Sequence, residues 1–191
     1  MWREIAYWGK KLDDAGLVSS RFGNISVRTK NGLLIKRTGV MLGNITGPED
    51  LVEVGLHPSK DDEDDSNESY ASTETPSHRA IYLSTNAKAI IHAHPRFGIV
   101  ESILQKDEVK PLDTEGLPFL GTIPIIDGET GSQILYDNVY KLFSTGKYKG
   151  ALNRGHGSFA IGADLADCFN TTAMIEHSCF VKYHVDLAKK Q

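Results

Sequence analysis

The chain has little cysteine, no long apolar run and no excess of positive charge, and each absence excludes a class of protein. Its two cysteines, Cys168 and Cys179, lie on one expected helix, too far apart for a disulfide within it, so both are expected to be buried thiols. No apolar run approaches the ~18 residues of a membrane span. A net charge of −4 leaves no basic stripe for nucleic acid. We therefore expect a chain that binds neither membrane nor nucleic acid.

The remaining composition is ordinary for a globular protein, with 40% hydrophobic and 24% charged residues. A length of 191 residues predicts one domain, over 1–191, with a full core. The N-terminal Met1-Trp2-Arg3-Glu4 lacks the apolar core of a signal peptide, so we expect a cytoplasmic location.

Periodic patterns predict alternating helices and strands of an α/β fold. Helices are expected from Trp2 to a cap at Gly16, over 76–83 with Thr75 as its N-cap, over 97–104 and 132–143, and from about 164 onward. Strands are expected over 25–27 and 33–35, joined by a turn at Asn31-Gly32, and over 51–54, 89–92 and 123–126. The segment 61–68 is mostly acidic and is expected to be a solvated loop. This order predicts a mixed sheet covered by helices on both faces, in three layers.

The most informative segment for chemistry is His92-Ala93-His94-Pro95, at the end of an expected strand. Side chains two residues apart in a strand point to the same side, so both imidazoles can reach one ion. Pro95 cannot donate a ladder hydrogen bond, which places the pair at the rim of a sheet. His156 lies between two glycines, and three histidines with an open position are a pattern for catalytic zinc. The other histidines considered are expected to be surface or contact residues: His57, His177 and His184.

Five segments resemble the class II aldolase/adducin family in order and spacing. They are Phe22–Arg28 (FGNISVR), Arg37–Gly39 (RTG), Ser72–His78 (STETPSH), the His-Ala-His triplet and Gly155–Gly157 (GHG). The resemblance covers roughly residues 1–187. It implies a central, mainly antiparallel sheet flanked by helices, assembled as a four-fold homotetramer with active sites between neighbouring subunits.

The resemblance also implies roles for individual residues. His92, His94 and His156 match the zinc ligands, and Glu74 matches the catalytic carboxylate. Six residues match positions that bind the substrate phosphate through amides and hydroxyls: Gly23, Asn24, Thr38, Gly39, Ser72 and Thr73. A cation chelated by a 2-hydroxy ketone stabilises the enediolate formed on carbon-carbon cleavage, and the same ligands accept cobalt, manganese or iron. From the residue pattern alone, Glu74 is a capping or surface carboxylate.

Position 74 favours one activity within the family. Pentulose-5-phosphate 4-epimerases carry aspartate where this chain has Glu74, whereas fuculose-phosphate aldolases carry glutamate. We therefore expect a zinc-dependent aldehyde-lyase that cleaves or forms a phosphorylated ketose of the fuculose-1-phosphate type, with dihydroxyacetone phosphate and a small aldehyde as the two halves. A 4-epimerase of the same fold and a non-enzymatic module like the adducin head are the alternatives.

Two departures from the family concern the second proton donor. The aldolases place a tyrosine between the second and third ligands, and the corresponding stretch 111–116 (PLDTEG) has none. No counterpart of a tail tyrosine follows the last expected helix before Gln191. Asp113 or Glu115 is a hypothetical replacement. A metalloprotease is disfavoured because no His-Glu-x-x-His occurs, and an amidohydrolase because its barrel is longer and carries His-x-His near the first strand.

Overall fold

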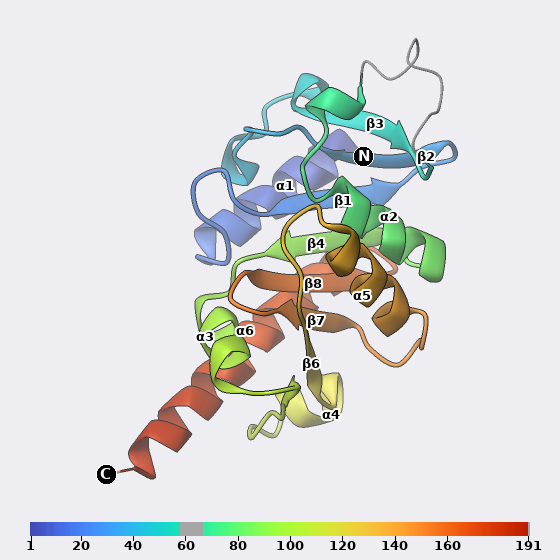
Figure 1. Cartoon of the computed structure of the whole chain (residues 1–191). Helices are drawn as coiled ribbons and strands as arrows, with labels where there is room; N and C mark the ends of the chain where they lie inside the picture. Colours follow the sequence, from blue (N-terminus) through green and yellow to red (C-terminus); the bar gives the residue numbers. More distant parts are fainter. Residues whose placement is uncertain (58–66, 191) are drawn as a thin grey trace.

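A computed structural model describes residues 1–57 and 67–190, and most of the acidic segment predicted as a loop lies outside them. The described residues form an eight-stranded sheet with helices on both faces (Figure 1). The strands are β1 (Asn24–Arg28), β2 (Gly32–Lys36), β3 (Leu51–Gly55), β4 (Ala89–Ala93), β5 (Glu108–Val109), β6 (Ile123–Ile126), β7 (Gly150–Asn153) and β8 (Gly157–Gly162). Their order is β3-β2-β1-β4-β8-β7-β6-β5, and each neighbouring pair is antiparallel except β6 with β7. The mixed, mainly antiparallel sheet is as predicted.

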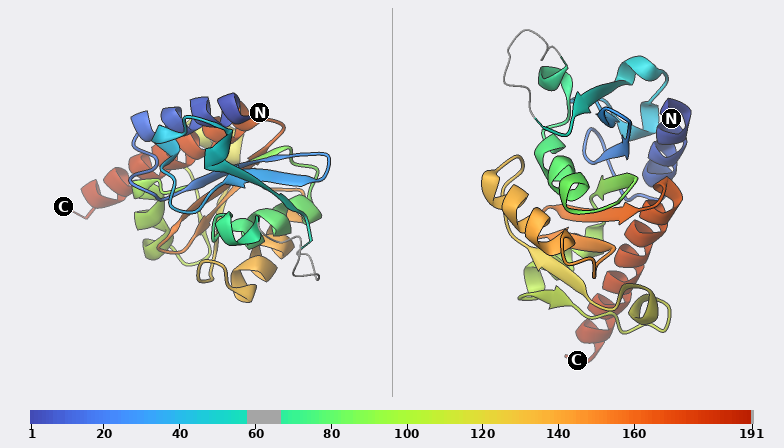
Figure 2. Two further views of the ribbon diagram at one scale, coloured as in Figure 1. Left: turned by 90° about the horizontal axis from the view of Figure 1, so that it is seen from above. Right: turned by 90° about the vertical axis from the view of Figure 1, so that its right-hand side faces the viewer.

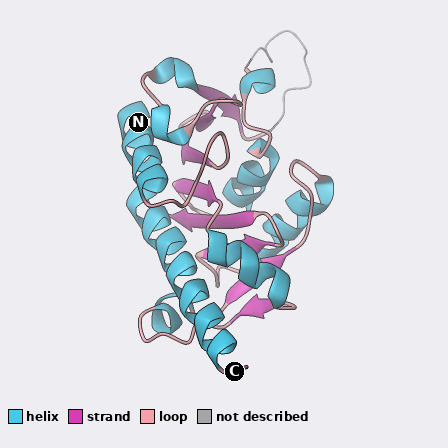
Figure 3. Cartoon of the chain, turned by 90° about the vertical axis from the view of Figure 1, so that its left-hand side faces the viewer, coloured by secondary structure: helices cyan, strands magenta, loops and turns pink. Residues whose placement is uncertain are grey.

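Helices form the outer two layers. They are α1 (Trp2–Asp14), α2 (Thr75–Ser84), α3 (Arg96–Leu104), α4 (Gly116–Leu120), α5 (Gln133–Phe143) and α6 (Leu165–Ala188), with 3-10 turns η1 (Leu42–Asn44), η2 (Pro48–Asp50) and η3 (Glu68–Tyr70). Helices α1 and α6 cover one face of the sheet and α2 and α5 the other (Figure 2). Helices α3 and α4 pack against α6, which runs along the molecule to the C-terminus (Figure 3). Within the described ranges, no helix is both long and apolar enough to cross a membrane.

Strand β4 lies in the middle of the sheet and is buried on both faces. Ile90 packs into the core under α2 and α5, whereas Ile91 packs into the core under α1 and α6. A strand covered on both faces has a continuous apolar sequence rather than an alternating one, which explains the run before His92. Cys168 and Cys179 are buried free thiols, as predicted.

The structure corrects two local predictions. The β1–β2 hairpin forms, but Gly32 is the first residue of β2 and is not among the glycines with positive φ. A Cβ on Gly32 would lie 2.0 Å from the Val54 carbonyl oxygen, so glycine is needed for close approach to β3 rather than for the turn. Thr75 is not the N-cap of α2: the cap position is Glu74, whose side chain makes no capping hydrogen bond. Thr75 is the first helical residue, and its hydroxyl donates to the Ser72 carbonyl at 2.6 Å.

Four of the helices and strands were not predicted from the sequence. The short strand β5 and the short helix α4 were not predicted. Strands β7 and β8, on either side of His156, were not predicted as strands either. They form an antiparallel hairpin whose tip carries that histidine.

Candidate functional site

Three histidines from two parts of the chain meet at one end of the sheet. His92 is in β4, His94 follows that strand, and His156 is in the turn between β7 and β8. One potential ligand atom from each residue lies within 4.8 Å of those of the other two. The Nε2 atoms of His92 and His94 are 3.1 Å apart. This arrangement matches the first three ligands of a cation site.

Each of the first two imidazoles is held by a defined contact. The Nδ1 atom of His92 donates to the Ser158 carbonyl oxygen at 3.0 Å, because a carbonyl can only accept. This bond leaves Nε2 of His92 as the atom with a free lone pair, facing His94. The ring of His94 is stacked on Phe22, with centroids 5.4 Å apart and planes at 15°. Both rings are therefore oriented before any ion binds.

A tight turn presents His156. The His156 amide donates to the Asn153 carbonyl oxygen at 3.0 Å, and Gly155 between them has φ +67°, which favours glycine. The Nδ1 atom of His156 lies 3.2 Å from Nδ2 of Asn153. Gly155, one of the two glycines noted beside His156 in the sequence, thus allows the chain to reverse at His156.

The three imidazoles are neutral at neutral pH. Burial lowers the pKa of His94 to about 4. Burial, and the neighbouring His94 and His156, hold the pKa of His92 well below its usual value, and burial also lowers the pKa of His156. Because a transition metal binds the unprotonated nitrogen, these residues form a suitable donor set.

Glu74 places a buried carboxylate beside this cluster. The residue is only 3% exposed, and its Oε1 lies 3.9 Å from Nδ1 of His156. Neither carboxylate oxygen has a regular hydrogen-bond partner among the described residues, although the nearby Thr130 and Ser77 hydroxyls partly offset the burial that raises the pKa of Glu74. Leaving a carboxylate buried without a partner is costly, and a bound cation or substrate hydroxyl would satisfy it. The chemistry of the residues present therefore fits a divalent cation.

The histidines and Glu74 line a cleft of about 500 Å³. All ten residues predicted for the site line it: Gly23, Asn24, Thr38, Gly39, Ser72, Thr73, Glu74, His92, His94 and His156. They come from the start of β1, the segment after β2, the loop before α2, the end of β4 and the β7–β8 turn. Oδ1 of the buried Asn24 has no hydrogen-bond partner among the described residues, so it also is available to a ligand.

The structure adds residues to this cleft that the sequence analysis missed. Lys36 is 3% exposed, and its ammonium donates to the carbonyl oxygens of Arg21 and Val40 at 2.9 and 2.8 Å. Burial lowers the pKa of Lys36 to about 8. Arg21, Phe22 and Thr130 also line the cleft. Lys36 is two residues before Thr38, and residues two apart along an extended chain point to the same side. This spacing was the signal in the sequence that could have placed Lys36 at the cleft.

The hypothetical acids Asp113 and Glu115 are not among the residues that line the cleft. Oδ1 of Asp113 accepts from the Gly116 amide at 2.5 Å, so Asp113 is bonded to the first residue of α4. Three further histidines are exposed and also do not line the cleft, as predicted: His57, His177 and His184. Neither Asp113 nor Glu115 therefore lies at the cleft of this single chain.

Gly157, at the start of β8, determines how closely the hairpin approaches His92. A Cβ at this position would lie 2.3 Å from the Ala93 carbonyl oxygen and 3.1 Å from Cε1 of His92. We expect Gly157→Ala to lower the free energy of unfolding by about 2–3 kcal/mol, because backbone atoms would have to move apart. Urea denaturation checks this value. The control Ser158→Ala keeps the carbonyl that binds His92 and should cost less than about 1 kcal/mol; equal losses would contradict the account.

Comparison with known proteins places this geometry in a family. The model of the class II aldolase and adducin N-terminal domain matches residues 3–183. The chain belongs to this family. The L-fuculose-1-phosphate aldolase of Thermus thermophilus superposes with a TM-score of 0.87 at 30% identity, over 99% of this chain and 95% of that one.

Curated relatives of this chain carry two different activities in their names. A methylthioribulose-1-phosphate dehydratase from Gluconobacter oxydans is 29% identical over 190 residues, covering 91% of this chain and 85% of the relative. An L-fuculose phosphate aldolase from Methanocaldococcus jannaschii is 29% identical over 171 residues, covering 87% of each. Class II aldolase membership is thus shown, whereas these relatives leave more than one substrate in consideration.

Proposed function

We propose that this chain is a zinc-dependent aldolase that cleaves or forms a phosphorylated ketose of the fuculose-1-phosphate type. The observation that carries the proposal is the convergence of three neutral imidazoles, His92, His94 and His156, beside the buried carboxylate of Glu74. A divalent cation held there would supply a Lewis acid for the carbonyl and hydroxyl oxygens of a 2-hydroxy ketone. The fuculose aldolases among the relatives support this choice.

Glu74 is the proposed proton carrier. On cleavage, the hydroxyl of the aldehyde half gives its proton to the Glu74 carboxylate as the carbon-carbon bond breaks, and the electron pair of that bond remains on the ketone half as an enediolate. Glu74 returns a proton to the carbon of that enediolate, and in the synthetic direction it removes the same proton. Burial raises the pKa of Glu74, which brings the carboxyl group closer to the range in which it can both accept and donate.

The phosphate is proposed to bind in the same cleft. Six residues there provide backbone amides, hydroxyls and one side-chain amide: Gly23, Asn24, Thr38, Gly39, Ser72 and Thr73. Gly23 and Gly39 have φ of +74° and +80°, conformations that suit amides converging on an anion. The ammonium of Lys36 supplies a positive charge that is partly withdrawn from solvent.

Lys36 gives a pH-dependent prediction. Its pKa of about 8 means that the side chain is charged below pH 8 and becomes neutral above it. The Kd of inorganic phosphate is therefore expected to rise between pH 7 and 9, when measured by isothermal titration calorimetry. Lys36→Met should abolish this rise and increase KM for a phosphorylated substrate about tenfold, with a smaller effect on kcat. The same rise in Lys36→Met would show that another group is responsible.

A dehydratase is the second candidate, favoured by the methylthioribulose-1-phosphate dehydratase relatives. Dehydration also begins by removing a proton next to the carbonyl of a phosphorylated hydroxy ketone, so it uses the same base and the same cleft. The products separate the two activities, since an aldolase releases a free aldehyde and a dehydratase releases water. A 4-epimerase would instead yield an epimeric pentulose phosphate with no free aldehyde.

The homotetramer with sites between subunits remains part of the proposal. Phe22, at the cleft, is 58% exposed, and Ile103 and Leu104, at the end of α3, are 62% and 61% exposed. Large apolar side chains at such positions support a subunit contact beside the cleft. Light scattering of the purified protein would measure the mass of the assembly.

The direct test of function is synthesis. Purified protein is incubated with dihydroxyacetone phosphate and a panel of small aldehydes, with and without a chelator. We expect a phosphorylated ketose with at least one aldehyde, loss of the reaction on chelation and recovery on adding zinc. No product with any aldehyde, together with water loss from methylthioribulose 1-phosphate, would establish the second candidate instead.

A further inference from the structure

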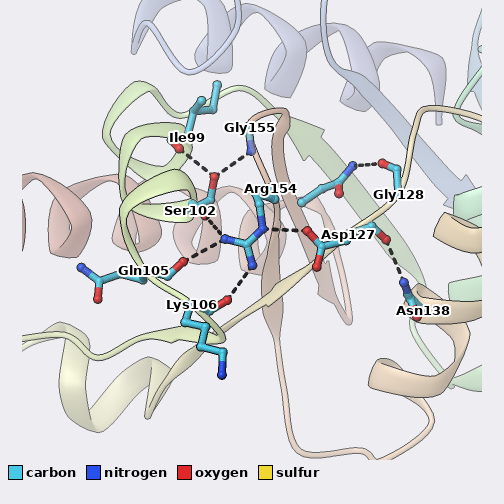
Figure 4. Close-up of polar contacts among 10 residues, drawn as sticks. Ile99, Ser102, Gln105, Lys106, Asp127, Gly128, Asn138, Arg154 and Gly155 are labelled. Atoms are coloured by element: carbon cyan, nitrogen blue, oxygen red, sulfur yellow. Dashed lines mark hydrogen bonds and ion pairs between the residues drawn. The ribbon is translucent and has the colours of Figure 1, made fainter.

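We propose that Arg154 is a positioning residue for the third metal ligand. Its guanidinium ties the β7–β8 turn, which carries His156, to the carboxyl end of α3 (Figure 4). This inference rests on the metal site proposed above and adds a residue that does not line the cleft.

The Arg154 guanidinium makes four hydrogen bonds. Nη1 donates to the carbonyl oxygens of Ser102 at 2.6 Å and Gln105 at 2.8 Å, and Nη2 donates to the Lys106 carbonyl oxygen at 2.5 Å. Nε donates to Oδ1 of Asp127 at 2.7 Å. The last carbonyls of a helix lack partners within the helix and carry its negative dipole end, so a guanidinium suits them in both geometry and charge.

The next residue strengthens the attachment. The Gly155 amide donates to Oγ of Ser102 at 2.9 Å, and that fully buried hydroxyl donates to the Ile99 carbonyl oxygen at 2.7 Å. Both residues that immediately precede His156 are therefore bonded to α3 (Figure 4). The turn cannot shift without breaking these bonds.

Helix α3 also begins at the site. It starts at Arg96, two residues after His94, and the carboxylate of Glu176 from α6 accepts from the amides of Phe97 and Gly98 at 2.8 and 3.1 Å. One end of α3 thus follows the second ligand, and the other end holds the turn of the third. The helix acts as a spacer that fixes His156 relative to His94.

The chemistry of arginine is needed for this role. Arginine has five donors in a planar fork, whereas lysine has a single ammonium that cannot reach separated carbonyls in the same way. The Asp127 side chain is 65% exposed, so the ion pair itself contributes little. The hydrogen bonds from Arg154 to the carbonyl oxygens at the end of α3 therefore hold the turn in place.

Arg28 provides a matched control. It donates to the carbonyl oxygens of Tyr82, Thr85 and Ala87, at and after the end of α2, so it too clamps the end of a helix. It lies at the far end of β1 from Asn24, about 13 Å along the strand from the cleft. Loss of Arg28 should therefore affect stability without affecting the metal.

The experiment compares Arg154→Gln, Arg154→Lys and Arg28→Gln in metal-free protein. Cobalt(II) is titrated into each, its affinity is measured from the visible absorption that also reports coordination geometry, and the urea midpoint is measured separately. We expect Arg154→Gln to weaken cobalt binding about tenfold or more and to change the spectrum, with a smaller loss for Arg154→Lys. The cobalt affinity of Arg28→Gln should stay within about twofold of that of the unaltered protein, while its urea midpoint falls.

Three results separate the possible failures. Unaltered cobalt affinity in Arg154→Gln would overturn the positioning role, as would an equal loss in Arg28→Gln. Absence of cobalt binding in the unaltered protein would instead refute the metal site. If Arg154→Gln does not fold, Ser102→Ala removes the acceptor of the Gly155 amide, together with the donor to the Ile99 carbonyl oxygen, and keeps the Ser102 carbonyl that binds Arg154. It should weaken cobalt binding about threefold; no change there would also overturn the inference.

Discussion

Glu74→Gln is expected to lower kcat by about 10²–10⁴-fold while the protein still binds one metal ion per chain. Glutamine has nearly the same shape as glutamate but cannot take or give a proton, so the substitution removes the proposed chemistry alone. Glu74 is 3% exposed, and its Oε1 lies 3.9 Å from Nδ1 of His156. Because neither carboxylate oxygen has a hydrogen-bond partner within the cut-off among the described residues, the substitution loses few contacts. Steady-state kinetics and metal analysis of the same sample measure both quantities.

Glu101→Gln is the control for this prediction. Glu101 is 1% exposed and burial raises its pKa, as it does for Glu74, but it packs in α3 outside the cleft. Its substitution should leave kcat within about twofold. A Glu74→Gln protein with full activity would remove the assigned base, and a protein that loses its metal would assign Glu74 to binding rather than to proton transfer.

The second large effect is expected from the third ligand. We expect His156→Ala to weaken zinc binding by roughly 10²–10³-fold, because an apparent binding free energy of ~10–16 kcal/mol is shared among about four ligands. His156 is at the tip of a hairpin and its side chain is 25% exposed, so the protein should still fold. Competition with a chromophoric chelator measures the affinity, and circular dichroism measures the fold.

His184→Ala controls for the loss of an imidazole. His184 is exposed on α6 and its Nδ1 donates to the Phe180 carbonyl oxygen at 2.9 Å, away from the cleft. Its removal should leave zinc affinity unchanged. If both variants bind zinc equally well, His156 is not a ligand and the cation is held by fewer histidines than proposed.

The sequence was sufficient to predict that the three histidines come together because two local rules apply there. The spacing of His92 and His94 places both imidazoles on one side of the end of β4. The glycines around His156 indicate a turn, and the structure places that residue in a turn with Gly155 at positive φ. The other cleft residues were predicted from the family resemblance, because no local sequence pattern indicates that Gly39 and Ser72 lie close together.

Other parts of the site depend on tertiary packing, which local sequence patterns indicate weakly or not at all. Lys36 is followed by Arg37 in a basic dipeptide, which on its own predicts a surface strand end, yet the Lys36 ammonium is buried against two carbonyls. Arg154 next to Gly155 on its own indicates only a polar turn. Its partners, at the end of α3, are about fifty residues earlier, so the contact could be found only in the folded chain.

Diffraction from a zinc-loaded crystal, with anomalous data at the zinc edge, tests the central claim most directly. The account predicts one strong peak per chain, about 2.0–2.1 Å from Nε2 of His92, Nε2 of His94 and one ring nitrogen of His156, with at least one further position open to the cleft. A peak bound by only two of these residues, with His156 turned away, or no peak in the cleft, would contradict it.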